Sequence, residues 1–194
     1  GLEVVEKIIS AAIEENIKYL TLFAFSTENW KRPMTEVNYL FKLLNNYIDN
    51  KIKNLINKNI KIKVIGNINS FPKLLKNKIR KVEKITNKNN QIQINMALNY
   101  GSREEIISTI KKLKKKKLII NEKNIEKNLY TSDIPDPDIL IRTGNTKRLS
   151  NFLLWQVAYS EIFFEKKLWP DFNEKDYDKI IKKFKNIKRN FGKI

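Results

Sequence analysis

The sequence predicts an α/β fold, a single domain with a central, mostly parallel sheet flanked by helices. Three observations lead to this prediction. Short apolar segments of strand length alternate with longer segments in which apolar residues recur at the helical period. The strand segments are apolar on nearly every residue, as is typical of parallel sheets covered on both faces. The chain shows no internal repeat and no Gly/Ser-rich linker, which favours one domain over residues 1–194.

The first half of the chain predicts six elements. Apolar residues recur at the helical period from Leu2 onward and again after Pro33, a residue that is well suited to opening a helix. The apolar run after Ile17 is expected to be a buried strand, and the next run ends at Gly66. In order, the expected elements are a helix at 2–15, a strand at 19–25, a helix at 33–56, a strand at 60–65, a helix at 72–86 and a strand at 92–98.

The second half predicts shorter elements. A helix starts at Ser102, and the run Lys111–Lys117 is interpreted as its solvated end, because blocks of like charge repel one another and stay in water. The later elements are expected as a short helix near 122–130, a strand at 138–142, a helix at 151–158, a strand at 162–164 and an amphipathic helix at 173–190.

The sequence contains no Cys and no His. Disulfides, thiolate chemistry, Cys/His zinc sites and an imidazole base are therefore excluded for these residues. With 41% hydrophobic residues the chain can bury a sizeable core, and no apolar run approaches the length of a membrane span. Any chemistry must use carboxylates, amides, hydroxyls, Arg or Lys.

The net charge of +18 by itself favours a nucleic-acid-binding domain. We discount this reading because Ile, Lys and Asn make up 87 of the 194 residues, the mix expected when a coding sequence drifts toward A and T. The chain has 6 Arg against 33 Lys, although the planar fork of Arg is the better phosphate ligand. Each Arg is therefore a candidate for a function that Lys cannot perform.

Ligands of parallel sheets bind at the carboxyl ends of the strands, and two long polar loops follow predicted strands here. The loop 142–151 holds Arg142, Arg148 and a Gly, with Ser150 at the expected start of the next helix. Guanidinium groups and free helix N–H groups suit a diphosphate. The alternative, an ordinary capped turn with two surface Arg, is about equally supported by the spacing alone.

The loop 25–33 places hydroxyls, a carboxylate, an amide, an indole and an Arg directly after a strand. Packing alone explains Trp30 as a core residue, but it does not easily explain the whole set. Glu161 precedes an apolar strand and is either a solvated strand start or a ligand of Mg²⁺, which favours one or two carboxylates together with substrate phosphate oxygens.

These motifs resemble the cis-prenyltransferase family, and most closely the bacterial undecaprenyl diphosphate synthases within it. The resemblance runs in order through nearly the whole chain. It is carried by residues 20–33 (LTLFAFSTENWKRP), 99–103 (NYGSR), 138–143 (DILIRT), 148–156 (RLSNFLLWQ), 158–161 (AYSE) and 168–172 (LWPDF).

The resemblance implies a Mg²⁺-dependent transferase that condenses isopentenyl diphosphate onto an allylic diphosphate such as farnesyl diphosphate, leaving a cis double bond at each step. The implied product is a polyprenyl diphosphate, the precursor of the undecaprenyl lipid carrier. A cis-prenyltransferase-like fold with a hydrophobic tunnel and a homodimer are implied as well. The location implied is cytoplasmic, peripheral at the membrane that receives the product, and no nucleic-acid partner is expected.

The motif match also implies site residues. Asn29 falls on the position assigned to helping remove the proton, and Glu161 falls on the metal position. Substrate-binding positions are matched by Ser26, Thr27, Glu28, Trp30 and Arg32, and the isopentenyl diphosphate site by Arg142, Arg148, Leu149 and Ser150.

The chain departs from the family in two places. Members begin with a strand ending in Asp-Gly-Asn-Gly-Arg-Trp, whose Asp helps bind Mg²⁺ with the allylic diphosphate, and no such string precedes the helix at 2–15. We therefore interpret the sequence as a fragment, or a gene product that has lost its start, and expect it to be poorly active alone. In the second place, Asn145 and Thr146 stand where the family commonly has a second Gly and a Glu, which leaves the loop geometry open.

Two other functions are considered. A non-catalytic subunit of a two-component prenyltransferase is favoured by the missing Asp string but opposed by the intact Arg32, Arg142 and Arg148. A basic nucleic-acid-binding domain is favoured by charge alone, and its lysines are scattered over several predicted helices.

Overall fold

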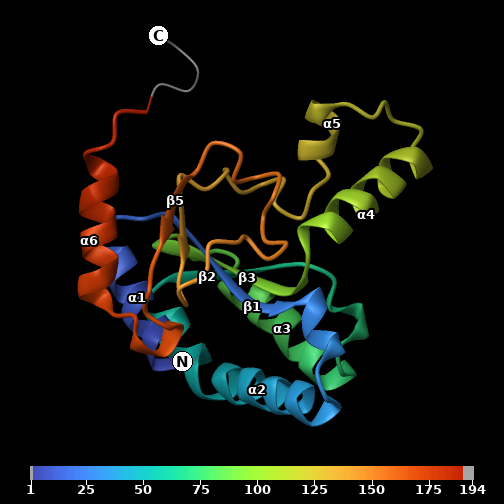
Figure 1. Cartoon of the computed structure of the whole chain (residues 1–194). Coiled ribbons are helices and arrows are strands. Elements are labelled where there is room, and N and C mark those ends of the chain that lie inside the picture. The colour runs from blue at the N-terminus through green and yellow to red at the C-terminus, as the bar shows by residue number, and fades with distance from the viewer. Residues whose placement is uncertain (1, 190–194) are drawn as a thin grey trace. The chain divides into compact units, whose positions relative to one another are not determined.

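The computed structural model describes residues 2–189 (Figure 1). Contacts divide the chain into two units. The central unit is Ile17–Ile134. The terminal unit joins the chain before Ile17 to the chain that follows Ile134. Both units are built from parallel strands and helices, which confirms the predicted α/β class.

The central unit contains a three-stranded parallel sheet. Its strands are β1 (Tyr19–Ser26), β2 (Ile60–Ile65) and β3 (Ile92–Tyr100), in the order β1-β3-β2. Every residue of β3 is buried except Met96, which is half-buried, so both faces of the middle strand are covered. β1 lies at the edge of this sheet. Phe25 is its one buried residue and most of the others are half-buried, so the strand is less buried than the sequence predicted.

Helices α2 (Met34–Asn57) and α3 (Lys73–Thr86) pack against each other and against β2. Each begins directly after a proline, whose fixed φ suits a helix start and whose missing N–H needs no partner there. Their apolar faces meet the strands in a core cluster formed by Phe25, Val37, Phe41, Phe71, Leu75, Ile79 and Leu98.

Four shorter elements complete the central unit. They are the 3₁₀ helices η1 (Thr27–Lys31) and η2 (Ile68–Ser70) and the helices α4 (Ser102–Lys115) and α5 (Glu122–Glu126). α4 follows β3 directly, its carboxyl end points away from the three-stranded sheet, and α5 packs beside it (Figure 1).

The terminal unit pairs two short parallel strands with two packed helices. Its elements are α1 (Leu2–Glu14), β4 (Ile139–Arg142), β5 (Glu161–Phe164), the 3₁₀ helix η3 (Trp169–Asp171) and α6 (Glu174–Lys185). α1 packs on α6, and Lys185 Nζ lies 2.5 Å from Glu15 Oε2. The side chain of Asn173 caps α6 by accepting from two backbone N–H groups of its first turn.

The predicted helix at 151–158 is absent, because the segment forms a series of turns. Asn151 and Leu153 have φ angles of 61° and 46°, which a right-handed helix does not allow. The final helix ends at Lys185 rather than at residue 190, and the short helix near 122–130 is confined to Glu122–Glu126. Over residues 2–189, the helices are too short or too polar to cross a membrane.

Candidate active site

The first group of candidate residues lies in η1, at the carboxyl end of β1. The Asn29 side chain folds back, and its Oδ1 accepts a hydrogen bond from the backbone N–H of Ser26 at 2.8 Å. Next to it, Thr27 Oγ1 donates to Glu28 Oε2 at 3.2 Å. These local bonds make the turn self-supporting, so hydroxyl, carboxylate and amide groups are held together on one tight turn.

Trp30 joins this turn to the core. Its ring packs edge-on against Phe25 and Phe41, with ring centres 5.5 and 5.7 Å apart, and its centre lies 6.2 Å from that of Phe71. Trp30 is therefore a core residue, as the packing interpretation of the sequence predicted. The same contacts fix the position of η1, because the indole ties the turn to residues of β1, α2 and the segment before α3.

Asn99 accepts a hydrogen bond from the indole of Trp30, and the sequence did not predict this role. Trp30 Nε1 donates to Asn99 Oδ1 at 2.8 Å, while Asn99 Nδ2 donates to the carbonyl oxygen of Asn67 at 2.6 Å and to Ser70 Oγ at 3.2 Å. Asn99 is 9% exposed and has a φ of 47°, a conformation that Asn tolerates well. In the sequence, the sign of such a role was the position of Asn99 at the end of a predicted strand, directly before Tyr100 and Gly101.

Gly66 brings the end of β2 close to the end of β3. A Cβ atom at this residue would lie 2.2 Å from the carbonyl oxygen of Leu98, and φ is +115°. The backbone N–H of the next residue, Asn67, then donates to the carbonyl oxygen of Asn99. Gly66 thus sets the spacing on which the Asn99 contacts depend.

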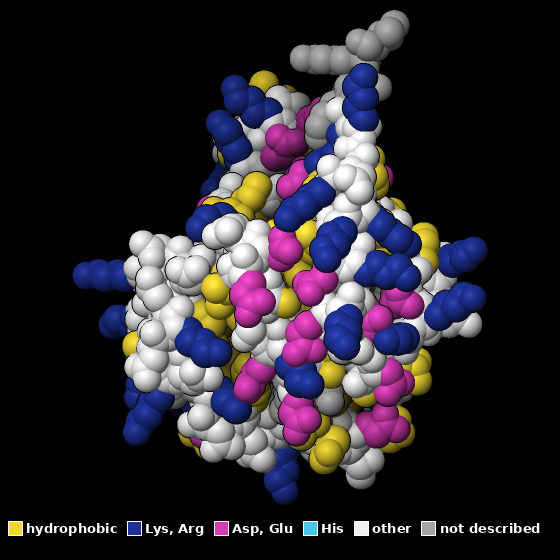
Figure 2. Space-filling model, turned by 90° about the vertical axis from the view of Figure 1, so that its left-hand side faces the viewer, with side chains coloured by type: hydrophobic (Ala, Val, Ile, Leu, Met, Phe, Trp, Pro, Cys, Tyr) yellow, Lys and Arg dark blue, Asp and Glu magenta, His cyan; other side chains and the backbone are white. Residues whose placement is uncertain are grey.

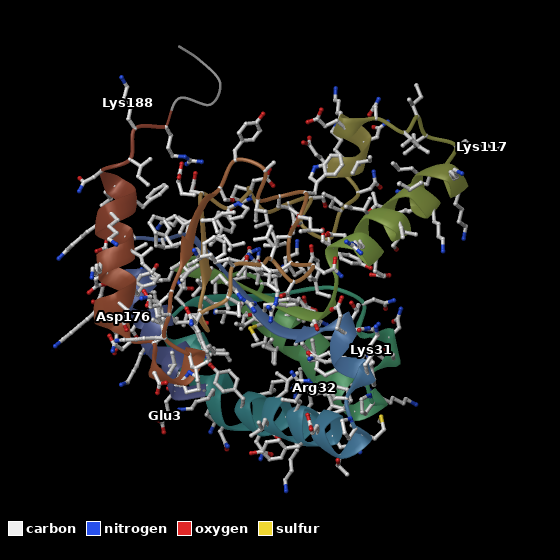
Figure 3. The ribbon with its side chains drawn as sticks, viewed as in Figure 1. Glu3, Lys31, Arg32, Lys117, Asp176 and Lys188 are labelled. Carbon is white, nitrogen blue, oxygen red and sulfur yellow. The ribbon has the colours of Figure 1, made fainter. Side chains whose placement is uncertain are left out.

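Arg32 ends the first group. Its guanidinium lies 3.8 Å from Glu36 Oε2, one turn into α2, and both side chains are more than half exposed. Figure 3 shows Lys31 and Arg32 at this end of the turn. A water-exposed pair at this distance is weak, so the guanidinium remains available for an anionic ligand.

The second group follows β4 in the terminal unit. Arg142 Nε donates to Thr146 Oγ1 at 2.9 Å, so the residue that replaces the family's Glu holds the guanidinium in place. Asn145 has a φ of 53°, the left-handed region that Asn tolerates best after Gly. The backbone N–H groups of Gly144 and Asn145 donate to the carbonyl oxygens of Lys167 and Glu165. The loop therefore retains a tight turn despite both replacements.

Arg148, Leu149 and Ser150 continue the same loop. Ser150 has a φ of 50° and does not cap a helix, so the anion site that we expected at a helix start is absent. Across the described residues, no acidic side chain forms an ion pair with Arg142 or Arg148. Two cations without counter-ions in one loop favour an anionic ligand.

Glu161 lies away from Arg142 along the two-stranded sheet. The register pairs Glu161 with Ile139 and Phe164 with Arg142, so the two charged residues occupy opposite ends of the pair of strands. Glu161 Oε1 is 4.0 Å from Arg189 Nε, and Arg189 also pairs with Asp138. Glu161 is therefore neither a bare solvated carboxylate nor a member of a ready metal cluster, since the described residues hold no group of three potential ligands.

Two adjacent carboxylates, Glu104 and Glu105, lie in the first turn of α4, directly after β3. Tyr100 donates its hydroxyl proton to Glu105 Oε2 at 2.6 Å, and the backbone N–H of Tyr130 donates to Glu105 Oε1 at 2.7 Å. Burial raises the pKa of Glu104, and the neighbouring Glu105 carboxylate adds to the shift. The pair fixes the start of α4 against the segment after α5.

The structure thus places the predicted residues in two sets. Six lie on one turn in the central unit, namely Ser26, Thr27, Glu28, Asn29, Trp30 and Arg32. The terminal unit holds the other five, with Arg142, Arg148, Leu149 and Ser150 in one loop and Glu161 at the far end of the strand pair.

Known proteins resemble this chain over nearly its whole length. Residues 1–192 match the model of the prenyltransferase family described as undecaprenyl diphosphate synthase. A Buchnera aphidicola protein named ditrans,polycis-undecaprenyl-diphosphate synthase ((2E,6E)-farnesyl-diphosphate specific) is 46% identical over 201 residues, which cover 100% of this chain and 81% of the relative.

Two crystal structures are close in fold. A Campylobacter jejuni protein assigned as a probable undecaprenyl diphosphate synthase superposes with a TM-score of 0.91 and 41% identity, covering 99% of this chain and 91% of that one. Lavandulyl diphosphate synthase from Lavandula x intermedia, in complex with dimethylallyl diphosphate, superposes with a TM-score of 0.93 and 31% identity. The match covers 98% of this chain and 86% of that one. The chain therefore belongs to the undecaprenyl diphosphate synthase family of cis-prenyltransferases.

Proposed function

We propose that this cis-prenyltransferase condenses isopentenyl diphosphate onto an allylic diphosphate and so builds a polyprenyl diphosphate of undecaprenyl length. The observation that carries the proposal is the loop after β4, in which Arg142 and Arg148 have no acidic partner among the described residues. The farnesyl-specific name of the Buchnera aphidicola relative supports farnesyl diphosphate as the primer.

The isopentenyl diphosphate is held by the loop after β4. Arg142 is fixed by its bond to Thr146, which leaves its terminal NH groups to donate to one phosphate. Arg148 and the exposed Ser150 add a second guanidinium and a hydroxyl. Leu149 packs against the carbon chain of the substrate.

The allylic diphosphate is bound by the turn η1 and by Arg32. The C–O bond to its diphosphate breaks as the terminal alkene carbon of isopentenyl diphosphate forms the new C–C bond. Cationic groups near the departing diphosphate stabilise the charge that develops on it. Trp30 and the rings packed on it shield the allylic cation from water.

A proton must then leave C2 of the isopentenyl unit to form the new double bond. Asn29 already accepts a bond at Oδ1, which leaves its Nδ2 protons as donors. An amide is too weakly basic to keep the proton, so Asn29 acts by orienting a diphosphate oxygen or a water molecule that takes it. Asn29 is thus a hydrogen-bonding residue rather than the base itself.

The metal proposal rests on Glu161. Mg²⁺ uses one or two carboxylates and takes its remaining ligands from phosphate oxygens and water, so a single Glu fits if the substrate supplies the rest. Asp138 lies just before the neighbouring strand and shares Arg189 with Glu161, so it is the candidate for a second carboxylate. When bound, Mg²⁺ neutralises diphosphate charge.

The assembly and location follow from the same function. From the family resemblance we propose a homodimer in the cytoplasm. We also propose that it is peripheral at the membrane, because the product has a long apolar chain that water does not dissolve. No nucleic-acid partner is needed to account for the charge, since Lys enrichment follows from composition.

The test is incorporation of labelled isopentenyl diphosphate, with farnesyl diphosphate and Mg²⁺, by this chain preceded by the N-terminal Asp-Gly-Asn-Gly-Arg-Trp segment that the family resemblance implies. This form is called the full-length protein below. The expected product is an undecaprenyl-length chain with new cis double bonds, and chelation of Mg²⁺ should abolish its formation. Binding of both diphosphates without any product, in the presence of Mg²⁺, would instead assign the chain as a non-catalytic subunit.

A further inference from the structure

The carboxyl end of α4 carries a dense positive charge next to exposed apolar side chains. Six of the seven residues in Lys111–Lys117 are lysine, and all six are exposed. Leu118, Ile119 and Ile120 follow at once and are 43%, 75% and 46% exposed. Within residues 2–189 this is the one place where three large apolar side chains in succession are exposed. We call residues 111–120 the basic–apolar patch.

The patch is a folded surface rather than a loose tail. The N–H of Lys117, at a φ of 55°, donates to Lys114, and the N–H of Leu118 donates to Leu113, both at 3.0 Å, which is the Schellman pattern of a helix end. Asn124 Nδ2 donates to the carbonyl oxygen of Ile119 at 2.8 Å. Figure 3 shows Lys117 at the tip of α4. The three apolar side chains are thus presented by an ordered turn.

The outer face of α4 extends the patch. The buried face consists of Ser102, Glu105, Thr109 and Leu113. At 100° per residue, Ile107, Lys111 and Lys114 fall within a narrow sector on the opposite side. Ile107 is 54% exposed. Lysine and isoleucine therefore share the helix face that points away from the core.

A solvated helix end, as expected from the sequence, explains the lysines but not the apolar turn beside them. A nucleic acid would bind the lysines through its phosphates but would leave the apolar turn exposed to water. The patch also has no aromatic residue on which a base could stack. An anionic bilayer uses both, because lysines attract lipid headgroups while Leu and Ile side chains enter the acyl boundary. From residue 111 to 127 there are eight Lys and two Glu, so the positive charge dominates the whole tip.

We propose that the basic–apolar patch docks the protein on membranes that contain anionic lipids. The inference rests on the proposed function in one respect, since the polyprenyl product belongs in such a membrane. It adds the surface and the lipid chemistry through which the peripheral association occurs. Lys111, Lys114 and Lys115 supply the electrostatic attraction, and Ile119, the most exposed of the three apolar residues, supplies the insertion.

The experiment is flotation of the full-length protein with vesicles of phosphatidylcholine alone or with 30% phosphatidylglycerol. We expect partition onto the anionic vesicles only. Changing Lys111, Lys114 and Lys115 together to Gln should weaken partition by about a hundredfold, at about fivefold per lysine. Ile119→Ser should weaken it by about tenfold.

Matched controls come from α3 and the residues directly after it. Leu74→Ser removes an apolar side chain that is 79% exposed, and Lys81→Gln with Lys84→Gln and Lys88→Gln removes three exposed lysines. Neither control should change the partition. Equal losses in patch and control variants, or equal binding to neutral vesicles, would overturn the proposal.

Two further readouts exclude other occupants. Light scattering reports the oligomeric state, and a change of mass in Ile119→Ser would make the patch an interface between copies of the chain. Preference of the patch for a DNA or RNA duplex over anionic vesicles at equal salt would also contradict membrane docking. Because flotation needs no catalysis, its result stands even if the condensation assay fails, so the two proposals are tested separately.

Discussion

Single residues in this protein act through hydrogen bonds that sequence motifs reveal only in part. The motif at residues 25–33 predicted Asn29 and Trp30 as site residues, and the structure shows the contacts that hold each side chain. Asn99 came to light only in three dimensions, because its partners Trp30 and Asn67 are far from it in the chain. Residues whose role is to position others leave little signal in a single sequence.

The Trp30–Asn99 bond gives a stability prediction. Trp30→Phe keeps an aromatic ring in the core but removes the N–H, so the largely buried Asn99 Oδ1 loses its donor. We expect the free energy of unfolding to fall by about 1–3 kcal/mol, measured by urea denaturation. In an Asn99→Ala background the same change should cost much less, and a full cost there would show that the bond is not the cause.

Glu104 gives a prediction for pH. Its pKa is raised above the usual 4.5 by burial and then by Glu105, so the folded protein keeps this proton after the unfolded chain has lost it. That contribution to stability is complete below pH 4.5 and is lost as the pH rises through the raised pKa. Glu104→Gln stays neutral and retains an acceptor, so it should be more stable than wild type at neutral pH.

The measurement is the urea midpoint of both proteins between acid and neutral pH. The advantage of Glu104→Gln should shrink as the pH falls and vanish in acid. Glu126→Gln, on the exposed surface of α5, serves as the control. A gain that is equal at every pH would contradict the assignment to a buried, ionised carboxylate.

At the scale of elements, periodicity predicted the strands and most helices well. It failed at 151–158, where the buried Leu153 and Val157 stand four residues apart, as on one face of a helix. The segment is instead turned by left-handed Ser150, Asn151 and Leu153, and a lone sequence gives no sign of this for Ser or Leu. Turns can thus bury two apolar residues that stand at helical spacing. Because the segment is not a helix, Ser150 is not a helix start.

The two turn glycines should differ in their tolerance of a side chain. Gly66→Ala places a Cβ 2.2 Å from the carbonyl oxygen of Leu98, so β2 and β3 must separate, and we expect a loss of roughly 2–4 kcal/mol. Gly144→Ala meets nothing closer than 3.9 Å and carries only the strain of its φ of +90°, about 1–2 kcal/mol. Urea unfolding of both variants checks the order, and the reverse order would refute the role given to Gly66.

At the scale of the whole molecule, the face around α6 shows no single basic groove of the kind that a nucleic acid needs (Figure 2). On the side that carries α6, Lys and Arg side chains are interspersed with Asp and Glu (Figure 2). The fold class and the family were readable from the sequence because the motifs are long and in order. The division into two units was not, since the chain before Ile17 joins residues beyond Ile134 only through long-range contacts.

We propose that the two diphosphates are bound by different residue sets, with Arg142 and Arg148 serving isopentenyl diphosphate. Arg148→Lys keeps the charge and loses the planar fork. Charge-assisted bonds contribute about 1.5–3 kcal/mol, so affinity for isopentenyl diphosphate should fall roughly ten- to a hundredfold. Arg80→Lys, on the exposed surface of α3, is the matched control and should bind both ligands as wild type does.

The most direct measurement is therefore calorimetric titration of the full-length wild type and Arg148→Lys with each diphosphate separately. Selective weakening of isopentenyl diphosphate, with the allylic diphosphate unchanged, is the predicted result. Equal weakening of both ligands, or of neither, would falsify the assignment of the loop after β4 to the isopentenyl diphosphate site.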